Sequence, residues 1–227
     1  MPEKPVLYIV GMPIGNPGDI SIRALEILKS ADLIFCETRK ETARFFKKHE
    51  IPFPKDSWFE INEHTKSNEI DDAFKLLMKV SSAVLISDSG MPVICDPGSE
   101  LIRRARKSDI SLKIIPGPTA LTTALALCGL STNQGFHFLG FPPRQTEKRG
   151  RFLAQAAKNP LPVVLYETPY RLKKILSEIQ KFIPKQKQIF IGIDLTSDSE
   201  YVFDGNIQEL SSIISTVPPG APVIILY

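Results

Sequence analysis

Residues 84–98 read Val84-Leu85-Ile86-Ser87-Asp88-Ser89-Gly90-Met91-Pro92-Val93-Ile94-Cys95-Asp96-Pro97-Gly98. The segment begins as a short apolar run with β-branched side chains, which is typical of a buried parallel strand. It continues with Asp, Ser, Gly and Pro, which predict two turns before a helix. In open α/β sheets, ligands bind beyond the carboxyl ends of the strands, where loops offer polar side chains and backbone amides. The segment therefore predicts a cofactor-binding loop.

Length and composition set the broad class of the protein. A chain of 227 residues is long enough for one or two domains. Its hydrophobic content of 43% and charged content of 23% are ordinary for a globular protein and argue against disorder. The net charge of +3 permits an anionic partner, but an evenly mixed surface with a slight excess of lysine explains it better.

The cysteines and the apolar runs indicate a cellular compartment. Cys36, Cys95 and Cys128 are far apart and lie in apolar surroundings, which predicts reduced, buried thiols and no metal site. The first residues contain no apolar signal segment, and no apolar run approaches the roughly 18 residues that a membrane span needs. We therefore expect a cytoplasmic protein that contacts no membrane.

Strands and helices alternate through the first half of the chain. Strands are expected at 6–10, 33–36, 59–61, 84–86 and 112–115, and helices at 20–28, 41–49, 67–79 and 98–107. This alternation predicts a parallel sheet covered on both faces, which forms a first domain over residues 1–117.

The second half of the chain has a different order of elements. Strands are expected at 136–141, 163–166, 189–194, 200–204 and 222–226, and helices at 119–127, 149–158, 169–182 and 207–214. Two neighbouring strands without a helix between them imply a mixed sheet. We expect a second α/β domain over residues 118–227.

A glycine-containing loop, residues 11–19, connects the first strand to the first helix. Such a loop places backbone amides and the positive end of a helix dipole near a bound anion. The dinucleotide fingerprint GxGxxG is only half met, because Pro13 stands where that pattern needs a glycine. Glu37, at the end of the second strand, would otherwise suit a ribose hydroxyl. An NAD site therefore stays an alternative.

Two further loops carry candidate ligand groups. Asp88 could accept hydrogen bonds from an amino group or a ribose hydroxyl, and Gly90 offers backbone contacts. Asp96 could do the same, or could serve only as a turn former or helix cap. Residues 116–120, PGPTA, form a stiff linker that either presents the Thr119 hydroxyl to a ligand or is a plain hinge.

Five segments resemble the successive motifs of the tetrapyrrole methylase superfamily. They are GMPIGNPGDI at 11–20, DSGMPVICDPG at 88–98, IPGPTA at 115–120, GFPP at 140–143 and YETPYRL at 166–172. The resemblance covers nearly the whole chain and is nearest to the branch of small-subunit ribosomal RNA cytidine 2′-O-methyltransferases. It implies a two-domain α/β enzyme that binds S-adenosylmethionine in a cleft between the domains and forms a homodimer.

The resemblance also implies which residues meet the cofactor. Those expected beside the methionine and ribose parts are Asp88, Ser89, Gly90, Met91, Ile94, Thr119 and Ala120. Those expected beside the adenosine are Tyr166, Glu167, Ala221 and Pro222. Pro13 and Asp96, from the two loops described above, complete the expected set.

The residues expected on the methyl-acceptor side of the site differ from those of the ribosomal RNA methyltransferase branch. After the second strand the branch has an acidic pair before Thr-Arg, whereas residues 37–42 read ETRKET and keep only the first carboxylate. Met91 stands where the branch usually has threonine. We expect Glu37 to be catalytic and to face the methyl acceptor, because a carboxylate ending a buried strand is costly without a partner. A salt bridge with Arg39 or Lys40 is the alternative.

The expected acceptor is RNA of the small ribosomal subunit. In support, residues 142–151 contain four basic side chains that could contact phosphates, Arg144, Lys148, Arg149 and Arg151. A second basic cluster at 103–107 is either a further phosphate-binding surface or a solvent-exposed helix face. Three alternatives stay open: methyl transfer to a small tetrapyrrole or corrinoid precursor, an NAD-dependent oxidoreductase, and a non-catalytic nucleotide-binding protein.

Overall fold

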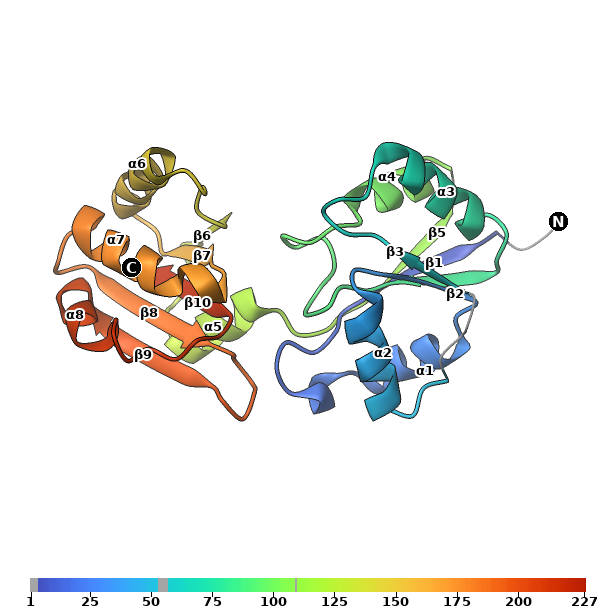
Figure 1. Ribbon diagram of the computed structural model, residues 1–227, viewed down its shortest axis with the longest axis horizontal. Helices are drawn as coiled ribbons and strands as arrows, with labels where there is room; N and C mark the ends of the chain where they lie inside the picture. The colour runs from blue at the N-terminus through green and yellow to red at the C-terminus, as the bar shows by residue number, and fades with distance from the viewer. Residues whose placement is uncertain (1–3, 53–56, 109) are drawn as a thin grey trace. The chain divides into compact units, whose positions relative to one another are not determined.

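The computed structural model describes residues 4–52, 57–108 and 110–227. The chain divides into two compact units, Met1–Thr119 and Ala120–Tyr227. Each unit has its own five-stranded sheet and its own helices (Figure 1). No helix of these described residues is both long enough and apolar enough to cross a membrane.

The sheet of the first unit is parallel throughout, as the alternation of strands and helices predicts. Its strands lie in the order β3-β2-β4-β1-β5, and every pair is parallel. Their bounds are Val6–Val10 for β1, Leu33–Cys36 for β2, Trp58–Glu60 for β3, Ser82–Leu85 for β4 and Ser111–Ile115 for β5. The neighbouring strands β4, β1 and β5 therefore all end at the same edge of the sheet, and the loops that follow them start there.

Helices cover both faces of this sheet. They are α1 (Ile22–Ser30), α2 (Arg39–Lys48), α3 (Ser67–Leu77) and α4 (Ser99–Lys107). Figure 1 shows α3 and α4 on one face and α1 and α2 on the other. Alternate side chains of β2 point to opposite faces of the sheet. Phe35 packs in the hydrophobic cluster with α3 and α4, and Ile34 packs in the hydrophobic cluster with α1 and α2. Burying each such side chain contributes roughly 1.5–3 kcal/mol.

The second unit has a mixed sheet, also as predicted. Its strands lie in the order β6-β7-β10-β8-β9, where β6 and β7 are parallel and the other pairs antiparallel. Their bounds are His137–Gly140 for β6, Val163–Tyr166 for β7, Gln188–Ile193 for β8, Tyr201–Asn206 for β9 and Pro222–Leu226 for β10.

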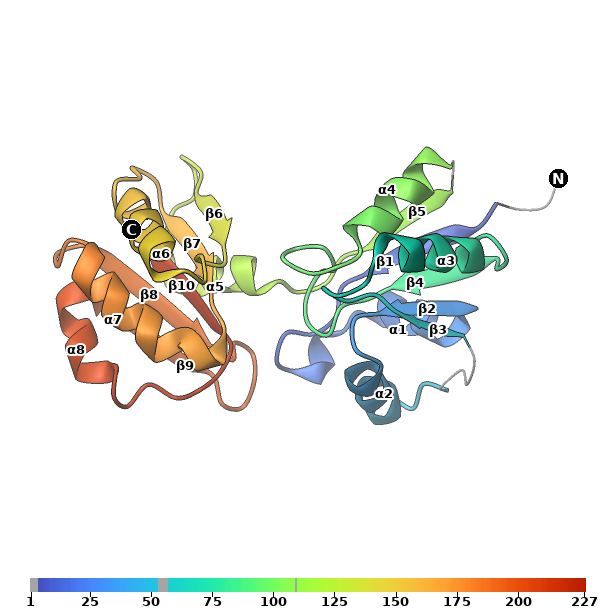
Figure 2. The same ribbon diagram turned by 45° about the horizontal axis from the view of Figure 1, so that its top comes forward.

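Helices α6 (Thr146–Ala157), α7 (Leu172–Phe182) and α8 (Leu210–Ile213) share one apolar core with this mixed sheet. Figure 2 shows α6, α7 and α8 gathered together over the strands. Helix α5 (Ala120–Cys128) contacts β10. Two short 3-10 turns, η2 (Pro169–Arg171) and η3 (Ile207–Glu209), directly precede α7 and α8.

Some expected boundaries and burials are wrong. Helix α6 starts at Thr146 instead of Arg149, because Gln145 is its N-cap residue and the Gln145 carbonyl accepts from the Arg149 amide. Of the three cysteines only Cys36 is buried, and burial raises the pKa of its thiol to about 11. Cys95 is exposed because it lies in the loop after β4, outside the sheet.

Candidate functional site

Three loops join at the carboxyl edge of the parallel sheet. They are residues 11–21 after β1, 86–98 after β4 and 116–119 after β5. The Gly11 amide donates to the Ile115 carbonyl at 2.9 Å, and the Met12 amide donates to the Gly90 carbonyl at 2.8 Å. The Gly90 amide donates in turn to the Pro13 carbonyl at 3.4 Å. Backbone hydrogen bonds thus fix the loops to one another.

Glycines allow the close approach of these loops. A Cβ atom at Gly11 would lie 2.6 Å from the Gly117 amide nitrogen, and one at Gly117 would lie 2.8 Å from the Gly11 carbonyl. Gly90 has φ of +73°, in the left-handed region that favours glycine. We call the pair Gly11 and Gly117 the glycine contact. It lets the backbones of the loops after β1 and β5 touch.

Replacing Gly117 by alanine is expected to lower the free energy of unfolding by roughly 1–3 kcal/mol, because the new methyl group overlaps backbone atoms that cannot rotate away. Denaturant titration measures the change. The matched control is Gly18→Ala on the loop after β1, where the added atom meets only the Asn16 side-chain oxygen at 3.2 Å. Equal losses in both variants would contradict the glycine contact.

The loop after β4 has an unusual backbone. Val93 and Cys95 have φ of 74° and 66°, in the left-handed region. For a β-branched residue such as Val93 this conformation is a clear outlier, and it costs on the order of 1–3 kcal/mol. Strain of this kind clusters at ligand sites, where the surrounding structure enforces it. The strain therefore marks residues 90–98 as a candidate ligand loop.

Glu37 and Asp88 connect two of the site's segments. The Glu37 carboxylate accepts a hydrogen bond from the Asp88 backbone amide at 3.2 Å. The Asp88 carboxylate in turn accepts one from the Thr38 amide at 3.1 Å. Asp88 thus lies at the amino-terminal end of α2, where a negative charge is favourable. The predicted cofactor ligand and the predicted catalytic carboxylate are direct neighbours.

Three carboxyl groups at this edge have raised pKa values. Burial, with the nearby Asp88 and Glu63 carboxylates, raises the pKa of Glu37, although the Asp88 amide opposes this. Burial also raises the pKa of Asp88, against its hydrogen bonds from Thr38. For Asp96, burial and the Glu37 charge raise the pKa to about 7. Of the three, the Asp96 carboxyl group can exchange a proton near neutral pH.

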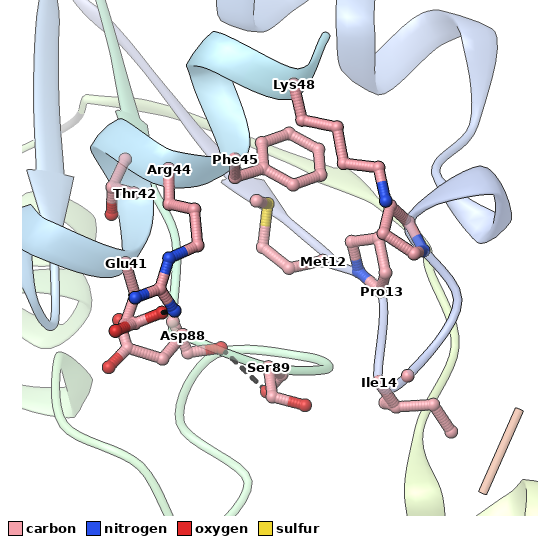
Figure 3. Close-up of a pocket in the computed structure, with 13 residues that line it drawn as sticks. Met12, Pro13, Ile14, Glu41, Thr42, Arg44, Phe45, Lys48, Asp88 and Ser89 are labelled. Carbon is pink, nitrogen blue, oxygen red and sulfur yellow. Dashed lines mark hydrogen bonds and ion pairs between the residues drawn. The ribbon is translucent and has the colours of Figure 1, made fainter. Parts of the chain in front are cut away.

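A pocket of about 330 Å³ opens beside these carboxylates. Helix α2, the loop after β1 and the loop after β4 form its walls (Figure 3). The residues that line it are Met12, Pro13, Ile14, Gly15, Pro17, Glu41, Thr42, Arg44, Phe45, Lys48, Ser87, Asp88 and Ser89. The sequence reasoning missed the contribution of α2. Its signal was the run RKETARFFKK at 39–48, which combines five basic residues with two aromatic ones.

The other expected cofactor residues of the first unit lie in the same loops. Ser89 and Ile94 are exposed, whereas Met91 is half-buried. The Met91 sulfur lies against Gly11, 2.6 Å from where a Cβ atom would be. Thr119 ends the first unit. The structure thus groups Pro13, Glu37, Asp88, Ser89, Gly90, Met91, Ile94, Asp96 and Thr119 in segments at the carboxyl edge of one sheet.

The remaining expected residues lie together in the second unit. Tyr166 ends β7 and is paired with Val223 of β10, and the Glu167 amide donates to the Pro222 carbonyl at 3.3 Å. The Tyr166 hydroxyl accepts a hydrogen bond from the amide of Leu121, which follows Ala120 in α5. Ala120, Tyr166, Glu167, Ala221 and Pro222 therefore form a second group.

One oxygen of the Glu167 carboxylate is already engaged. Glu167 Oε1 accepts from the Thr168 amide at 2.6 Å and from Arg171 Nε at 2.7 Å. The side chain is only 1% exposed, and Oε2 is buried with no hydrogen-bond partner among the described residues. Oε2 is therefore an acceptor that a hydrogen-bond donor of a ligand could satisfy.

The expected phosphate contact of Arg149 is wrong. Its side chain is 3% exposed and pairs with Glu178, and it also donates to the carbonyls of Pro143 and Arg144. Arg144, Lys148 and Arg151 remain exposed in the same region. In the second basic cluster, Arg103 and Arg104 pair with Glu100 and Asp71, which supports the reading as a solvated helix face.

Comparison with known proteins agrees with this arrangement. Residues 6–211 match the family of Tetrapyrrole (Corrin/Porphyrin) Methylases. The chain is 38% identical over 221 residues to "Ribosomal RNA small subunit methyltransferase I" of Mycoplasmopsis pulmonis, covering 97% of each chain. It is 35% identical over 220 residues to the protein of the same name from Leptospira biflexa, covering 96% of this chain and 88% of that one.

Solved structures share the fold at low sequence identity. A cobalt precorrin-4 methyltransferase matches with a TM-score of 0.68 and 16% identity, covering 97% of this chain and 93% of that one. Uroporphyrin-III C-methyltransferase from Thermus thermophilus, in complex with S-adenosylhomocysteine, matches with a TM-score of 0.65 and 16% identity, covering 96% of each chain. The fold is that of a two-domain α/β methyltransferase. The chain belongs to the tetrapyrrole methylase family of S-adenosylmethionine-dependent methyltransferases.

Proposed function

We propose that this chain transfers a methyl group from S-adenosylmethionine to the ribose 2′-hydroxyl of a cytidine in small-subunit ribosomal RNA. The observation that carries the proposal is the link between Glu37 and Asp88, which places a carboxylate of raised pKa next to the cofactor loop. The names of the relatives at 35–38% identity support ribosomal RNA of the small subunit as the acceptor class. The solved tetrapyrrole methyltransferases bear on the fold alone.

The residues at the loop edge suit S-adenosylmethionine better than NAD. A 3-10 turn, η1 (Pro17–Asp19), stands between the glycine loop and α1. The first turn of α1 is capped by Ser21, whose hydroxyl accepts from the Ala24 amide at 3.1 Å. The loop therefore does not lead straight into a helix amino terminus, as a dinucleotide site requires. Instead it packs against the loops after β4 and β5 through backbone contacts.

Each unit contributes residues that we propose as cofactor contacts. From the first unit these are Pro13, Asp88, Ser89, Gly90, Met91, Ile94, Asp96 and Thr119. From the second unit these are Ala120, Tyr166, Glu167, Ala221 and Pro222. S-adenosylmethionine supplies an electrophilic methyl group on a sulfonium sulfur.

Glu37 then acts on the acceptor. Its carboxylate would take the proton of the ribose 2′-hydroxyl. The bound cofactor would supply the methyl group, which passes from the sulfonium sulfur to the ribose oxygen and leaves S-adenosylhomocysteine behind. The Asp88 amide fixes the orientation of that carboxylate. Because a methyl transfer of this type depends largely on the alignment of the reacting atoms, the stiff loops around the glycine contact contribute by restricting motion.

Two measurements test the proposal. In calorimetry, the purified protein is expected to bind S-adenosylmethionine and not NAD. Incubation with small ribosomal subunits from a bacterial strain that lacks this modification is expected to yield 2′-O-methylcytidine on nucleoside mass spectrometry. A tighter response to NAD would favour an oxidoreductase, and methylation of a tetrapyrrole precursor without methylation of RNA would favour the small-molecule alternative.

The proposed acceptor also bears on location and assembly. A protein that modifies ribosomal RNA works in the cytoplasm of a bacterial cell, where ribosomal subunits are assembled. We further propose that the chain forms a homodimer, which light scattering of the purified protein would test. A monomer with full methyltransferase activity would remove this part of the proposal.

A further inference from the structure

Helix α2 presents one face to the pocket of about 330 Å³ in the first unit. The pocket residues Glu41, Arg44, Phe45 and Lys48 follow the spacing i, i+3, i+4 and i+7, so they lie along one side of the helix. Figure 3 shows Arg44 and Lys48 extending on either side of Phe45, with Asp88 and Ser89 across from them. The pocket therefore has a basic and aromatic wall facing an acidic one.

The aromatic wall is firmly placed and partly exposed. The ring of Phe45 is half-buried and contacts the rings of Phe46 and His49, with centroids 6.4 Å and 4.3 Å away. The side chain of Met12 lies beneath it (Figure 3). An aromatic ring fixed in this way is a stacking platform for a planar group, and the bases of unpaired RNA bind proteins through such platforms.

The basic wall is available to an anion. Arg44 pairs with Glu41 at 2.7 Å, but both side chains are well exposed, at 68% and 40%, and such pairs contribute little. Lys48 has no ion-pair partner among the carboxylates of residues 4–52, 57–108 and 110–227. A phosphate could therefore displace Glu41 from Arg44 and gain Lys48 as a second contact.

The pocket also adjoins the proposed base. Asp88 lines the pocket, and its amide donates to the Glu37 carboxylate. Glu37 itself does not line the pocket, so it adjoins the pocket through Asp88. Ligand pockets range over roughly 300–1,000 Å³, so this one is near the lower end and suits a single nucleotide better than a four-ring macrocycle.

We propose that this pocket receives the acceptor nucleotide, with its base stacked on Phe45 and its flanking phosphates on Arg44 and Lys48. The inference rests on the proposed function and names the residues that select RNA as its acceptor. It extends the site to α2, which none of the five sequence motifs includes.

Two pocket variants and one control test this inference. Phe45→Leu keeps apolar bulk and removes the ring, and Arg44→Ala with Lys48→Ala removes both cations. The matched control is Lys40→Ala with Lys47→Ala, which removes two exposed cations of the same helix outside the pocket. The KM for hypomethylated small ribosomal subunits is measured for each, with thermal unfolding and calorimetric binding of S-adenosylmethionine as checks.

We expect Phe45→Leu to raise the KM for subunits about tenfold, because a stacking contact is lost. The double pocket variant should raise it by a similar factor and flatten the dependence of RNA affinity on salt by nearly one unit for each lost contact. The control pair should change the KM less than threefold. Binding of S-adenosylmethionine should not change in any of the three. Thermal unfolding should not change in the two charge variants, and Phe45→Leu should lower the melting temperature only slightly because its ring is half-buried.

Other outcomes overturn the inference without touching the proposed function. Equal losses in the control and pocket pairs would mean that α2 binds RNA as a diffuse basic surface. Loss of S-adenosylmethionine binding in the pocket variants would assign the pocket to the cofactor. If the unmodified chain methylates no RNA at all, the proposed function itself fails.

Discussion

Replacing Glu37 by glutamine is expected to lower kcat for methyl transfer to RNA by roughly 100- to 10,000-fold, the usual contribution of a positioned general base. The amide oxygen of glutamine can still accept the hydrogen bond from the Asp88 backbone, so the loop geometry should persist. Binding of S-adenosylmethionine should therefore stay the same in calorimetry. Single-turnover transfer of a radiolabelled methyl group measures the chemical step directly.

The control for Glu37→Gln is Glu63→Gln. The Glu63 carboxylate also raises the pKa of Glu37, but its side chain is 73% exposed and lies outside the pocket. It should change kcat only slightly. Full turnover in Glu37→Gln would exclude this carboxylate as the base and favour its purely structural role beside Asp88.

If Glu37 is the general base, its pKa determines how the reaction rate depends on pH. A base must be ionised to accept a proton, so kcat should fall as the pH drops through the raised pKa of Glu37. Burial and the Asp88 and Glu63 carboxylates raise that pKa. The ionised Glu37 carboxylate in turn raises the pKa of Asp96 to about 7, so Asp96 still holds its proton where Glu37 ionises.

Asp96→Asn removes the neighbouring carboxyl group. Because protonated Asp96 and asparagine are both uncharged, the acid limb of the kcat profile should stay at the same pH, with turnover retained above pH 8. An acid limb that moves to lower pH would show that the Asp96 charge acts on Glu37 as Glu37 ionises. Complete loss of turnover in Asp96→Asn, with activity kept in Glu37→Gln, would make Asp96 the base.

The architecture was predictable because its determinants are local in the sequence. Buried parallel strands need continuous apolar runs, and β2 with its Leu33–Cys36 sequence is buried at every position. The turn residues of 87–98 mark the loop at the sheet edge for the same reason. Both sheets agree with the sequence reasoning because the buried strands and the turns that end them carry local signals in the sequence.

The features that sequence reasoning missed depend on such distant contacts. Asp88 and Thr38 are 50 residues apart, and their hydrogen bond places α2 against the cofactor loop. Because of that contact, the basic residues of α2 lie beside the loop after β4 and form one wall of the pocket. Likewise, the burial of Arg149 follows from Glu178, which is 29 residues away. Within the sequence, Arg149 and the exposed Arg151 look alike.

Replacing Arg149 by alanine is expected to lower the free energy of unfolding by roughly 3–5 kcal/mol. The guanidinium is buried and donates to Glu178 Oε1 at 2.6 Å and to the Arg144 carbonyl at 2.7 Å. It lowers the pKa of Glu178, whose side chain is only 14% exposed. Without it, a nearly buried carboxylate and two carbonyl groups lose their partner. Denaturant unfolding measures the loss.

A matched pair of variants distinguishes this structural role from RNA binding. Arg151→Ala removes an arginine two residues further along α6 whose side chain is 79% exposed and whose pair with Glu147 is 3.6 Å long, so it should change stability by no more than about 0.5 kcal/mol. Arg149→Met with Glu178→Leu replaces the ion pair by apolar groups and should recover most of the stability. If Arg149→Ala instead leaves the unfolding curve intact and weakens RNA binding, the side chain must leave its buried pair to reach the phosphate.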